Sequence, residues 1–127
     1  MVVAAFASWH EHHERARNAL DQGLRLIDRC ALETYSVLTR LPPPHRSPGP
    51  IARDFLRLCF VDPFLRLDAR ASKTFVLELP GRARAGGSAY DALVAATAAA
   101  YSATLLTCDR RAASVYETYG VQVTYLG

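Results

Sequence analysis

The sequence predicts a single α/β domain in which helices flank a central parallel sheet. The chain has 127 residues, of which 50% are hydrophobic, and a chain of this length buries roughly two thirds of its unfolded surface in one core. Strand-like segments alternate with helical segments, and strands joined by helices pair in parallel. No apolar run approaches the ~20 residues that cross a bilayer. We therefore expect one domain over residues 1–127, without a membrane segment.

The first half of the chain predicts helices wherever apolar residues recur at three- or four-residue spacing, and strands at short apolar runs. The helices are expected at 10–21, 31–41 and 51–59, and the strands at 24–27 and 64–67. Gly23 ends the first helix, and the three prolines at 42–44 open a loop that runs to Pro50.

The second half predicts three more helices and two strands around one exposed basic loop. The helices are expected at 71–79, 89–101 and 110–119, the strands at 104–108 and 121–126, and the loop at 80–88. The 89–101 helix is apolar or small on nearly every side, so we expect it to be buried between other elements. Gly120 ends the last helix.

The basic residues are almost all arginines. Arg supplies 14 of the 15, Lys73 is the single lysine, and the formal net charge is +3. Arg binds phosphate with two hydrogen bonds and stacks on bases, which is consistent with a nucleic-acid partner. A GC-rich genome, which favours Arg and Ala codons, explains the same excess equally well. Charge alone therefore leaves nucleic acid as one candidate partner.

Three cysteines, Cys30, Cys59 and Cys108, are widely spaced in apolar sequence. Their odd number and spacing argue against a disulfide framework and against a four-thiolate zinc site. We expect small core residues. The apolar opening, residues 1–6, lacks the basic region and the length of a signal peptide, so we expect a cytoplasmic protein.

Three acids are expected at one rim of the sheet. Glu33 is expected to open the helix after strand 24–27, Asp91 lies in the first turn of the buried helix, and Asp109 directly follows strand 104–108. Ligands of open parallel sheets bind beyond the carboxyl ends of the strands, which is where these acids are expected. They are therefore the candidate functional residues.

Each acid also has a purely structural interpretation. Ser88 and Asp91 fit a capping box, Asp109 fits the N-cap of the last helix, and Glu33 suits a helix N-terminus. However, acids gathered on one rim repel one another unless a divalent cation bridges them. Carboxylates with water suit Mg²⁺ or Mn²⁺, which can activate water for phosphodiester hydrolysis. Thr107 is expected either to orient an acid or a bound water, or simply to favour the strand.

The same residues carry a resemblance to a known family. The segments SAYDALVAATA (88–98), ATLLTCDRR (103–111) and YGVQV (119–123) resemble the C-terminal half of a PIN domain, most of all the VapC ribonuclease toxins of bacterial toxin–antitoxin pairs. WHEHHERAR (9–17) resembles the helix after the first strand of that family, and LETYSVL (32–38) resembles the segment that carries its helix-borne glutamate.

The resemblance implies a three-layer α/β/α fold with a central parallel sheet, and an acidic quartet that binds Mg²⁺ or Mn²⁺ and cuts RNA endonucleolytically. Glu33, Asp91 and Asp109 match three members of the quartet. The fourth, an Asp at the end of the first strand, has no counterpart, because residues 1–6 resemble the segment just after it. We therefore expect a truncated first strand, and expect an N-terminally extended form to be more stable and more active.

The resemblance also implies partners. We expect an RNA substrate whose phosphates contact arginines, a small VapB-like antitoxin, and a homodimer. The candidate phosphate contacts are Arg82, Arg84, Arg110 and Arg111. The alternative is a degenerate PIN domain that binds RNA or an antitoxin peptide without cutting, as the missing acid favours. A phosphoacceptor receiver domain is a weaker reading, because Lys73 stands in the wrong segment for it.

Overall fold

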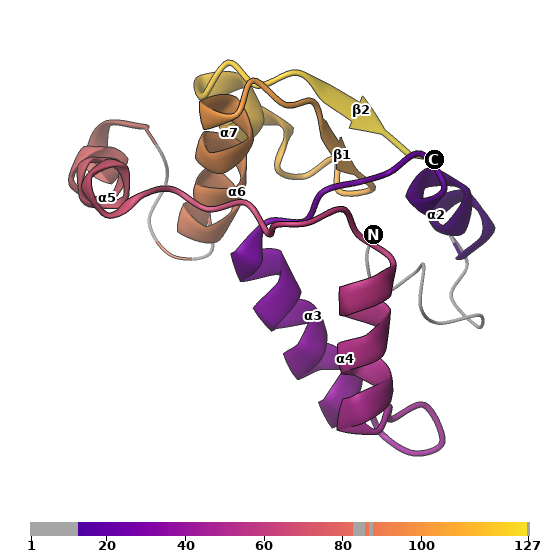
Figure 1. Ribbon diagram of the computed structural model, residues 1–127. Helices are drawn as coiled ribbons and strands as arrows, with labels where there is room; N and C mark the ends of the chain where they lie inside the picture. Colours follow the sequence, from indigo (N-terminus) through magenta and orange to yellow (C-terminus); the bar gives the residue numbers. More distant parts are fainter. Residues whose placement is uncertain (1–12, 83–85, 87, 127) are drawn as a thin grey trace. The chain divides into compact units, whose positions relative to one another are not determined.

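The described residues form six helices and two strands (Figure 1). The computed structural model describes residues 13–82, 86 and 88–126. They belong to two units, one up to Leu65 and one from Arg66 to Leu126. Within the described part of the chain, no helix has the length and apolarity needed to cross a membrane. The single domain expected over residues 1–127 stays a prediction.

The first unit contains three helices, α2 (His13–Leu20), α3 (Asp28–Arg40) and α4 (Gly49–Leu58). They confirm the three helices predicted for this half. Both α3 and α4 begin before the predicted residue. α4 includes Pro50 because proline is tolerated in the first turn, where its missing N–H has no helical acceptor.

The two strands predicted in this unit pair in parallel, but only at one point. Ile27 and Leu65 form an isolated parallel bridge. The Leu65 N–H donates to the Leu26 carbonyl and the Asp28 N–H donates to the Leu65 carbonyl, both at 2.9 Å. The predicted parallel direction is therefore confirmed, whereas the predicted strand lengths at 24–27 and 64–67 are wrong. Helix α3 begins directly after Ile27, so the chain leaves the extended conformation there.

The core of the first unit is formed by residues of α3, of α4 and of the segments just before α3 and just after α4. Its buried residues are Leu26, Ala31, Leu56 and Phe60. Cys30 and Cys59 pack against this cluster and are half-buried free thiols, as is Cys108 in the second unit. Burial, followed by the negative charge of Glu33, raises the pKa of the Cys30 thiol to about 11. Cys30 and Cys59 thus line the core of the first unit, and none of the three cysteines is fully buried.

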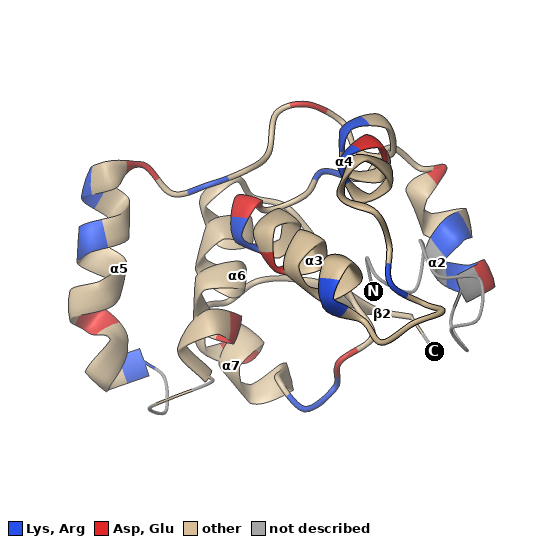
Figure 2. Ribbon diagram, turned by 90° about the horizontal axis from the view of Figure 1, so that it is seen from below, with Lys and Arg blue, Asp and Glu red and all other residues tan. Residues whose placement is uncertain are grey.

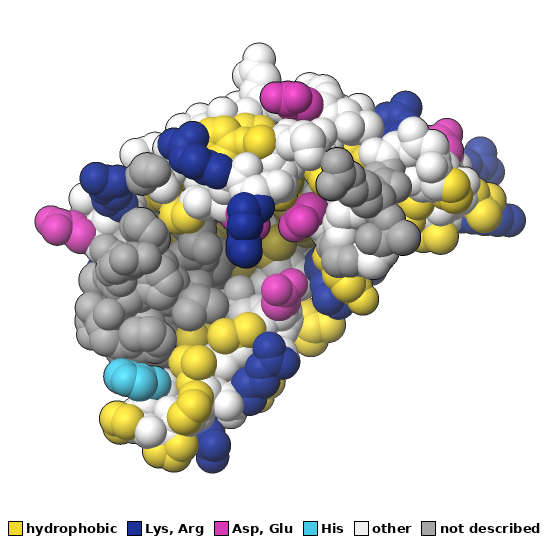
Figure 3. Space-filling view, turned by 180° about the vertical axis from the view of Figure 1, so that it is seen from behind, with side chains coloured by type: hydrophobic (Ala, Val, Ile, Leu, Met, Phe, Trp, Pro, Cys, Tyr) yellow, Lys and Arg dark blue, Asp and Glu magenta, His cyan; other side chains and the backbone are white. Residues whose placement is uncertain are grey.

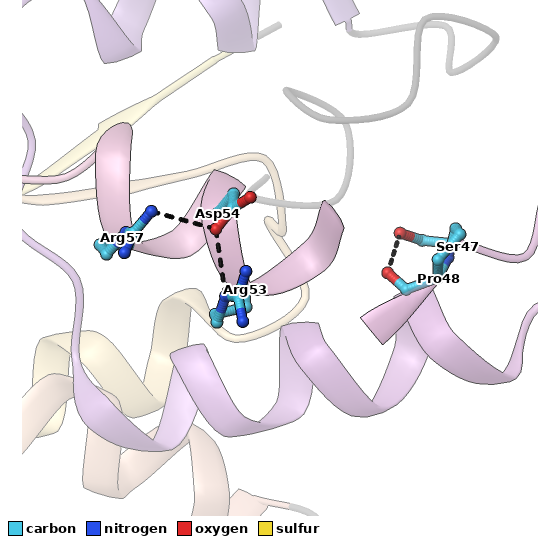
Figure 4. Close-up of polar contacts among 5 residues, drawn as sticks. All are labelled: Ser47, Pro48, Arg53, Asp54 and Arg57. Atoms are coloured by element: carbon cyan, nitrogen blue, oxygen red, sulfur yellow. Dashed lines mark hydrogen bonds and ion pairs between the residues drawn. The ribbon is translucent and has the colours of Figure 1, made fainter. Parts of the chain in front are cut away.

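The surface of α4 carries a charge cluster. Asp54 Oδ1 accepts hydrogen bonds from Arg53 Nε at 3.1 Å and from Arg57 Nη2 at 3.2 Å (Figure 4). All three side chains are exposed to solvent to a large degree. Exposed pairs of this kind contribute little to stability.

The second unit holds a parallel two-stranded sheet and three helices. The strands are β1 (Leu105–Thr107) and β2 (Val123–Tyr125), and the helices are α5 (Ala69–Arg82), α6 (Ser88–Ala100) and α7 (Ala113–Thr118). Leu105 pairs with Val123 and Thr107 with Tyr125, in parallel. Both strands lie inside the predicted ranges, and their parallel pairing is confirmed. The three-layer arrangement stays a prediction.

Helix α5 runs further than predicted. Pro80, Gly81 and Arg82 are helical, so the basic loop expected from residue 80 begins later. Charged residues of both signs lie along this helix (Figure 2). Arg82 pairs with Glu78 at 3.9 Å and lies over the ring of Tyr119, 5.4 Å from its centroid. These contacts hold the last turn in place despite the backbone hydrogen bond that Pro80 cannot make.

Helix α6 packs through small side chains. Ala92, Ala95, Thr97 and Ala98 are buried, and Ala95 packs with Ala112 and Tyr116 in the core of the second unit. The predicted burial of this helix is confirmed for one face, whereas Tyr90 is exposed. Small residues let helix backbones approach closely, and α6 and α7 contact each other.

Candidate metal centre

Asp109 lies in a tight turn at the carboxyl end of β1. Its Oδ1 accepts hydrogen bonds from the Arg111 backbone N–H at 2.9 Å and from Arg111 Nε at 3.3 Å. Its own backbone N–H donates to Thr107 Oγ1 at 3.0 Å. The turn delays α7, whose N-cap is Ala112. The structural alternative that made Asp109 the N-cap of this helix is therefore wrong, as is the predicted helix start at residue 110.

Asp91 approaches the same place from α6, where it lies in the first turn as predicted. The residue that links the two acids is Tyr116 on α7, which is only 5% exposed. Burial raises the pKa of the Tyr116 phenol above its ordinary value, and the negative charges of Asp91 and Asp109 raise it further. A side-chain hydrogen bond with Thr107 opposes this rise. Asp91 and Asp109 are thus the two acids whose charges act on the Tyr116 phenol.

The donor atoms of this group fit a hard divalent cation. They are carboxylate and hydroxyl oxygens, and Mg²⁺ keeps several waters while binding to one or two carboxylates. Within the residues that the structure describes, no three His, Cys, Asp or Glu side chains form a metal-binding group. The roles of Glu33, Asp91 and Asp109 as metal ligands therefore stay predictions.

Glu33 lies in the first unit and does not open its helix. It is the sixth residue of α3, and the acid in the first turn is Asp28. The expectation that Glu33 stands at the helix start is therefore wrong, because the helix begins as soon as the bridge at Ile27 ends. Glu33 lies 3.9 Å from Arg29 Nε, one turn earlier, and its side chain is largely exposed.

The candidate phosphate-binding arginines differ in their surroundings. Arg82 is held between Glu78 and Tyr119 at the end of α5, as described above. Arg110 lies over the ring of Tyr125, 4.6 Å from its centroid. The Arg111 side chain is 94% exposed and reaches only Asp109 among the contacts seen. Arg84 and residues 1–6 lie outside the described residues.

Sequence reasoning missed Tyr116. An aromatic residue on the apolar face of the last helix is typical of a core position, and Tyr116 is indeed in the core. Asp109 precedes α7 and does not lie on it, so helical spacing gave no signal that relates Tyr116 to this acid.

Asp109 follows a parallel strand, and Asp91 lies in the first turn of the helix before that strand. The resemblance to PIN domains implied acids at both positions. The PIN domain family matches residues 1–118, and the chain belongs to that family, in its VapC-type branch. The chain is 46% identical to Ribonuclease VapC40 of Mycobacterium tuberculosis, from strains CDC 1551 / Oshkosh and ATCC 25618 / H37Rv, over 97% of this chain and 92% of the relative. It is 39% identical to Ribonuclease VapC27 of strain H37Rv, over 94% of this chain and 80% of the relative. No solved structure matches the chain.

Proposed function

We propose that this protein is a divalent-metal-dependent endoribonuclease, the toxin of a toxin–antitoxin pair. The observation that carries the proposal is the match to the PIN domain family and to relatives named as ribonucleases, with Asp91 in the first turn of α6 and Asp109 just after β1. Relatives named as ribonucleases match almost the whole chain, which supports RNA as the substrate. The proposed reaction is hydrolysis of RNA phosphodiester bonds with Mg²⁺ or Mn²⁺.

Each residue of the site has a proposed role. Asp91 and Asp109 hold the ion, Thr107 orients Asp109, and Glu33 is the proposed third acid. A bound divalent ion would activate water and offset the charge that develops on the phosphate. Arg110 and Arg111 follow Asp109 directly, and we propose that their guanidinium groups contact phosphates beside the scissile bond. Arg82 and Arg84 are proposed to bind phosphates further along the RNA.

A protein partner is part of the proposal. Large hydrophobic side chains are exposed on α3 and α4, among them Leu32 at 64%, Ile51 at 52% and Leu58 at 73%. Figure 3 shows hydrophobic side chains between charged ones on the face it displays. Exposed apolar groups of this size favour contact with another protein. A small VapB-like antitoxin, and a second copy of this chain in a homodimer, are the proposed partners.

The test is cleavage of a defined RNA by the purified chain with Mg²⁺ or Mn²⁺, with EDTA as the metal-free reference. We expect cleavage that EDTA abolishes and that falls to the EDTA level in Asp91→Asn and Asp109→Asn. Asp54→Asn is the matched control, because Asp54 is already paired with Arg53 and Arg57 on α4. Cleavage that persists in both site variants would contradict the proposal.

RNA binding without metal-dependent cleavage would favour the alternative, a PIN domain that binds RNA or an antitoxin peptide. Glu33 is tested in the same assay through Glu33→Gln. Glu78→Gln is its control, because Glu78 has the same relation to an arginine on its own helix, at the same 3.9 Å. If both Gln variants cut RNA equally well, Glu33 has no role in the site.

A further inference from the structure

Tyr125 lies at the carboxyl end of the sheet, beside the end of β1. It is the last residue of β2 and pairs with Thr107, the last residue of β1. The Leu126 N–H donates to the Thr107 carbonyl at 2.9 Å, which fixes the two strand ends side by side. Leu105 and Val123, paired two positions earlier, both pack against the core of the second unit. Because strand side chains alternate between the two faces, Thr107 and Tyr125 point to this same face.

The ring of Tyr125 carries the guanidinium group of Arg110. The guanidinium carbon Cζ lies 4.6 Å from the ring centroid, within the ~6 Å over which an aromatic ring attracts a cation. Arg110 is exposed, whereas Tyr125 is half-buried. Arg110 directly follows Asp109, whose backbone N–H donates to Thr107 Oγ1 at 3.0 Å. The tyrosine ring thus holds a positive charge next to the turn that presents the Asp109 carboxylate.

An aromatic ring holds a guanidinium group without neutralising it, because the ring has a quadrupole but no net charge. Two other candidate phosphate contacts pair with carboxylates. Arg82 lies 3.9 Å from Glu78, and Arg111 lies 3.3 Å from Asp109. A phosphate must compete with those carboxylates for its arginine, but it does not compete with the ring of Tyr125.

We propose that Tyr125 is a positioning residue, which holds the Arg110 guanidinium group beside Asp109 so that it binds a phosphate of the RNA there. This inference rests on the proposed function, since RNA is the ligand. An arginine side chain loses much rotamer freedom when it binds a phosphate. A contact that orders the side chain beforehand removes part of this loss. Tyr125 acts through Arg110 and needs no contact of its own with the substrate.

The contact itself is tested without metal or RNA. The ring current shifts a nucleus above an aromatic ring upfield, so the side-chain protons of Arg110 should resonate upfield of those of Arg111 in NMR spectra recorded with EDTA. The difference should persist in Tyr125→Phe and vanish in Tyr125→Val, since valine also favours strands but has no ring. Arg110 signals that coincide with those of Arg111 in the wild type would overturn the inference, and this comparison needs no variant.

The consequence is tested by the binding of a short single-stranded RNA of defined sequence in EDTA, where metal-dependent cleavage cannot occur. We expect Tyr125→Val to weaken binding about 2- to 5-fold, the range that a cation–π contact at an exposed site gives. Tyr125→Phe, which keeps the ring, should bind like the wild type. In an Arg110→Ala background, Tyr125→Val should have no further effect, because the ring then has no cation to hold.

Tyr101→Val is the control for the loss of a tyrosine from the second unit. Tyr101 is 45% exposed, and its hydroxyl group donates to the Arg66 carbonyl at 2.9 Å. This variant should bind RNA like the wild type.

Thermal melts of the same variants separate a positioning role from a structural one. An equal loss of RNA affinity from Tyr125→Val with and without Arg110, or a lower melting temperature with unchanged affinity, would give Tyr125 a structural role only and overturn the inference. A wild-type chain that binds no RNA at low salt would overturn it as well. A wild-type chain that binds RNA but does not cut it with Mn²⁺ would instead overturn the proposed function, and the Tyr125 and Arg110 variants would still decide the inference.

Discussion

Arg111 forms an exposed ion pair with Asp109, one of the two proposed metal ligands. Arg111 Nε lies 3.3 Å from Asp109 Oδ1, and the Arg111 side chain is 94% exposed. An exposed pair of this kind is worth at most about 1 kcal/mol. A divalent cation can therefore displace the guanidinium group, which would then be available to a phosphate.

This exchange predicts opposite effects of Arg111→Ala on two ligands. Mn²⁺ should bind more tightly, because the Arg111 guanidinium group no longer competes for Asp109. The ion pair is worth at most about 1 kcal/mol, which corresponds to a gain in affinity of up to about 5-fold. RNA should bind more weakly, with the slope of log affinity against log salt shallower by about one phosphate contact. Calorimetry and RNA titrations over a salt series measure the two effects.

Arg53→Ala is the control for this prediction, because Arg53 contacts Asp54 at 3.1 Å in a comparable exposed pair on α4. It should change neither affinity for Mn²⁺ nor the salt dependence of RNA binding. If Arg111→Ala weakens Mn²⁺ binding, Arg111 positions Asp109 instead of competing with the metal.

At the scale of elements, α6 depends on the small size of its inward residues. Ala95 is completely buried and packs against Ala112 and Tyr116, whereas Ala99 on the same helix is exposed. Overfilling a well-packed core costs about 1–3 kcal/mol. The helix that carries Asp91 is therefore sensitive to volume on one face only.

We expect Ala95→Val to lower the free energy of unfolding by about 1–3 kcal/mol. Ala99→Val should lower it by less than about 0.7 kcal/mol, since only the weaker helix propensity of valine acts there. Urea unfolding followed by circular dichroism measures both. Equal losses in the two variants would show that α6 does not pack closely through Ala95.

The elements also show what sequence patterns can predict. The spacing of apolar residues predicted all six helices that the structure describes, because burial of one face controls that spacing. The alternation of strands with helices predicted the parallel direction of the strands. The lengths of the strands were not predictable in this way. Whether an apolar run stays extended depends on partners far along the chain, as with Ile27 and Leu65.

Two helix ends were also predicted wrongly. α5 continues through Pro80 to Arg82, whose guanidinium group lies over the ring of Tyr119, 37 positions further on. α7 starts late because the Asp109 carboxylate binds the Arg111 backbone N–H and forms a turn first. In the candidate site, the positions of Asp91 and Asp109 followed from the pattern of strands and helices. Tyr116 is buried against Ala95 and Ala112, tertiary contacts that no short-range pattern predicted.

At the scale of the whole molecule, the proposed acids come from both units. Asp91 and Asp109 belong to the second unit, whereas Glu33 belongs to the first. The role of Glu33 is therefore a proposal separate from that of Asp91 and Asp109, and the Glu33→Gln variant tests it by itself. The family match, which covers residues 1–118, spans both units.

The two parallel pairings differ in the length of chain that each must close. Leu105 and Val123 are 18 positions apart, whereas Ile27 and Leu65 are 38 apart. Loop closure costs about (3/2)RT ln n, so the longer loop costs roughly 0.7 kcal/mol more, which is about a threefold difference in closure probability. We expect the segment 105–125 to assemble earlier during folding. Pulse-labelling hydrogen exchange should then protect the Leu105 N–H, which donates to the Gln122 carbonyl, before the Leu65 N–H. The reverse order would mean that packing of α3 on α4 brings the distant segments together first, and that helix docking rather than loop length sets the folding sequence of this chain.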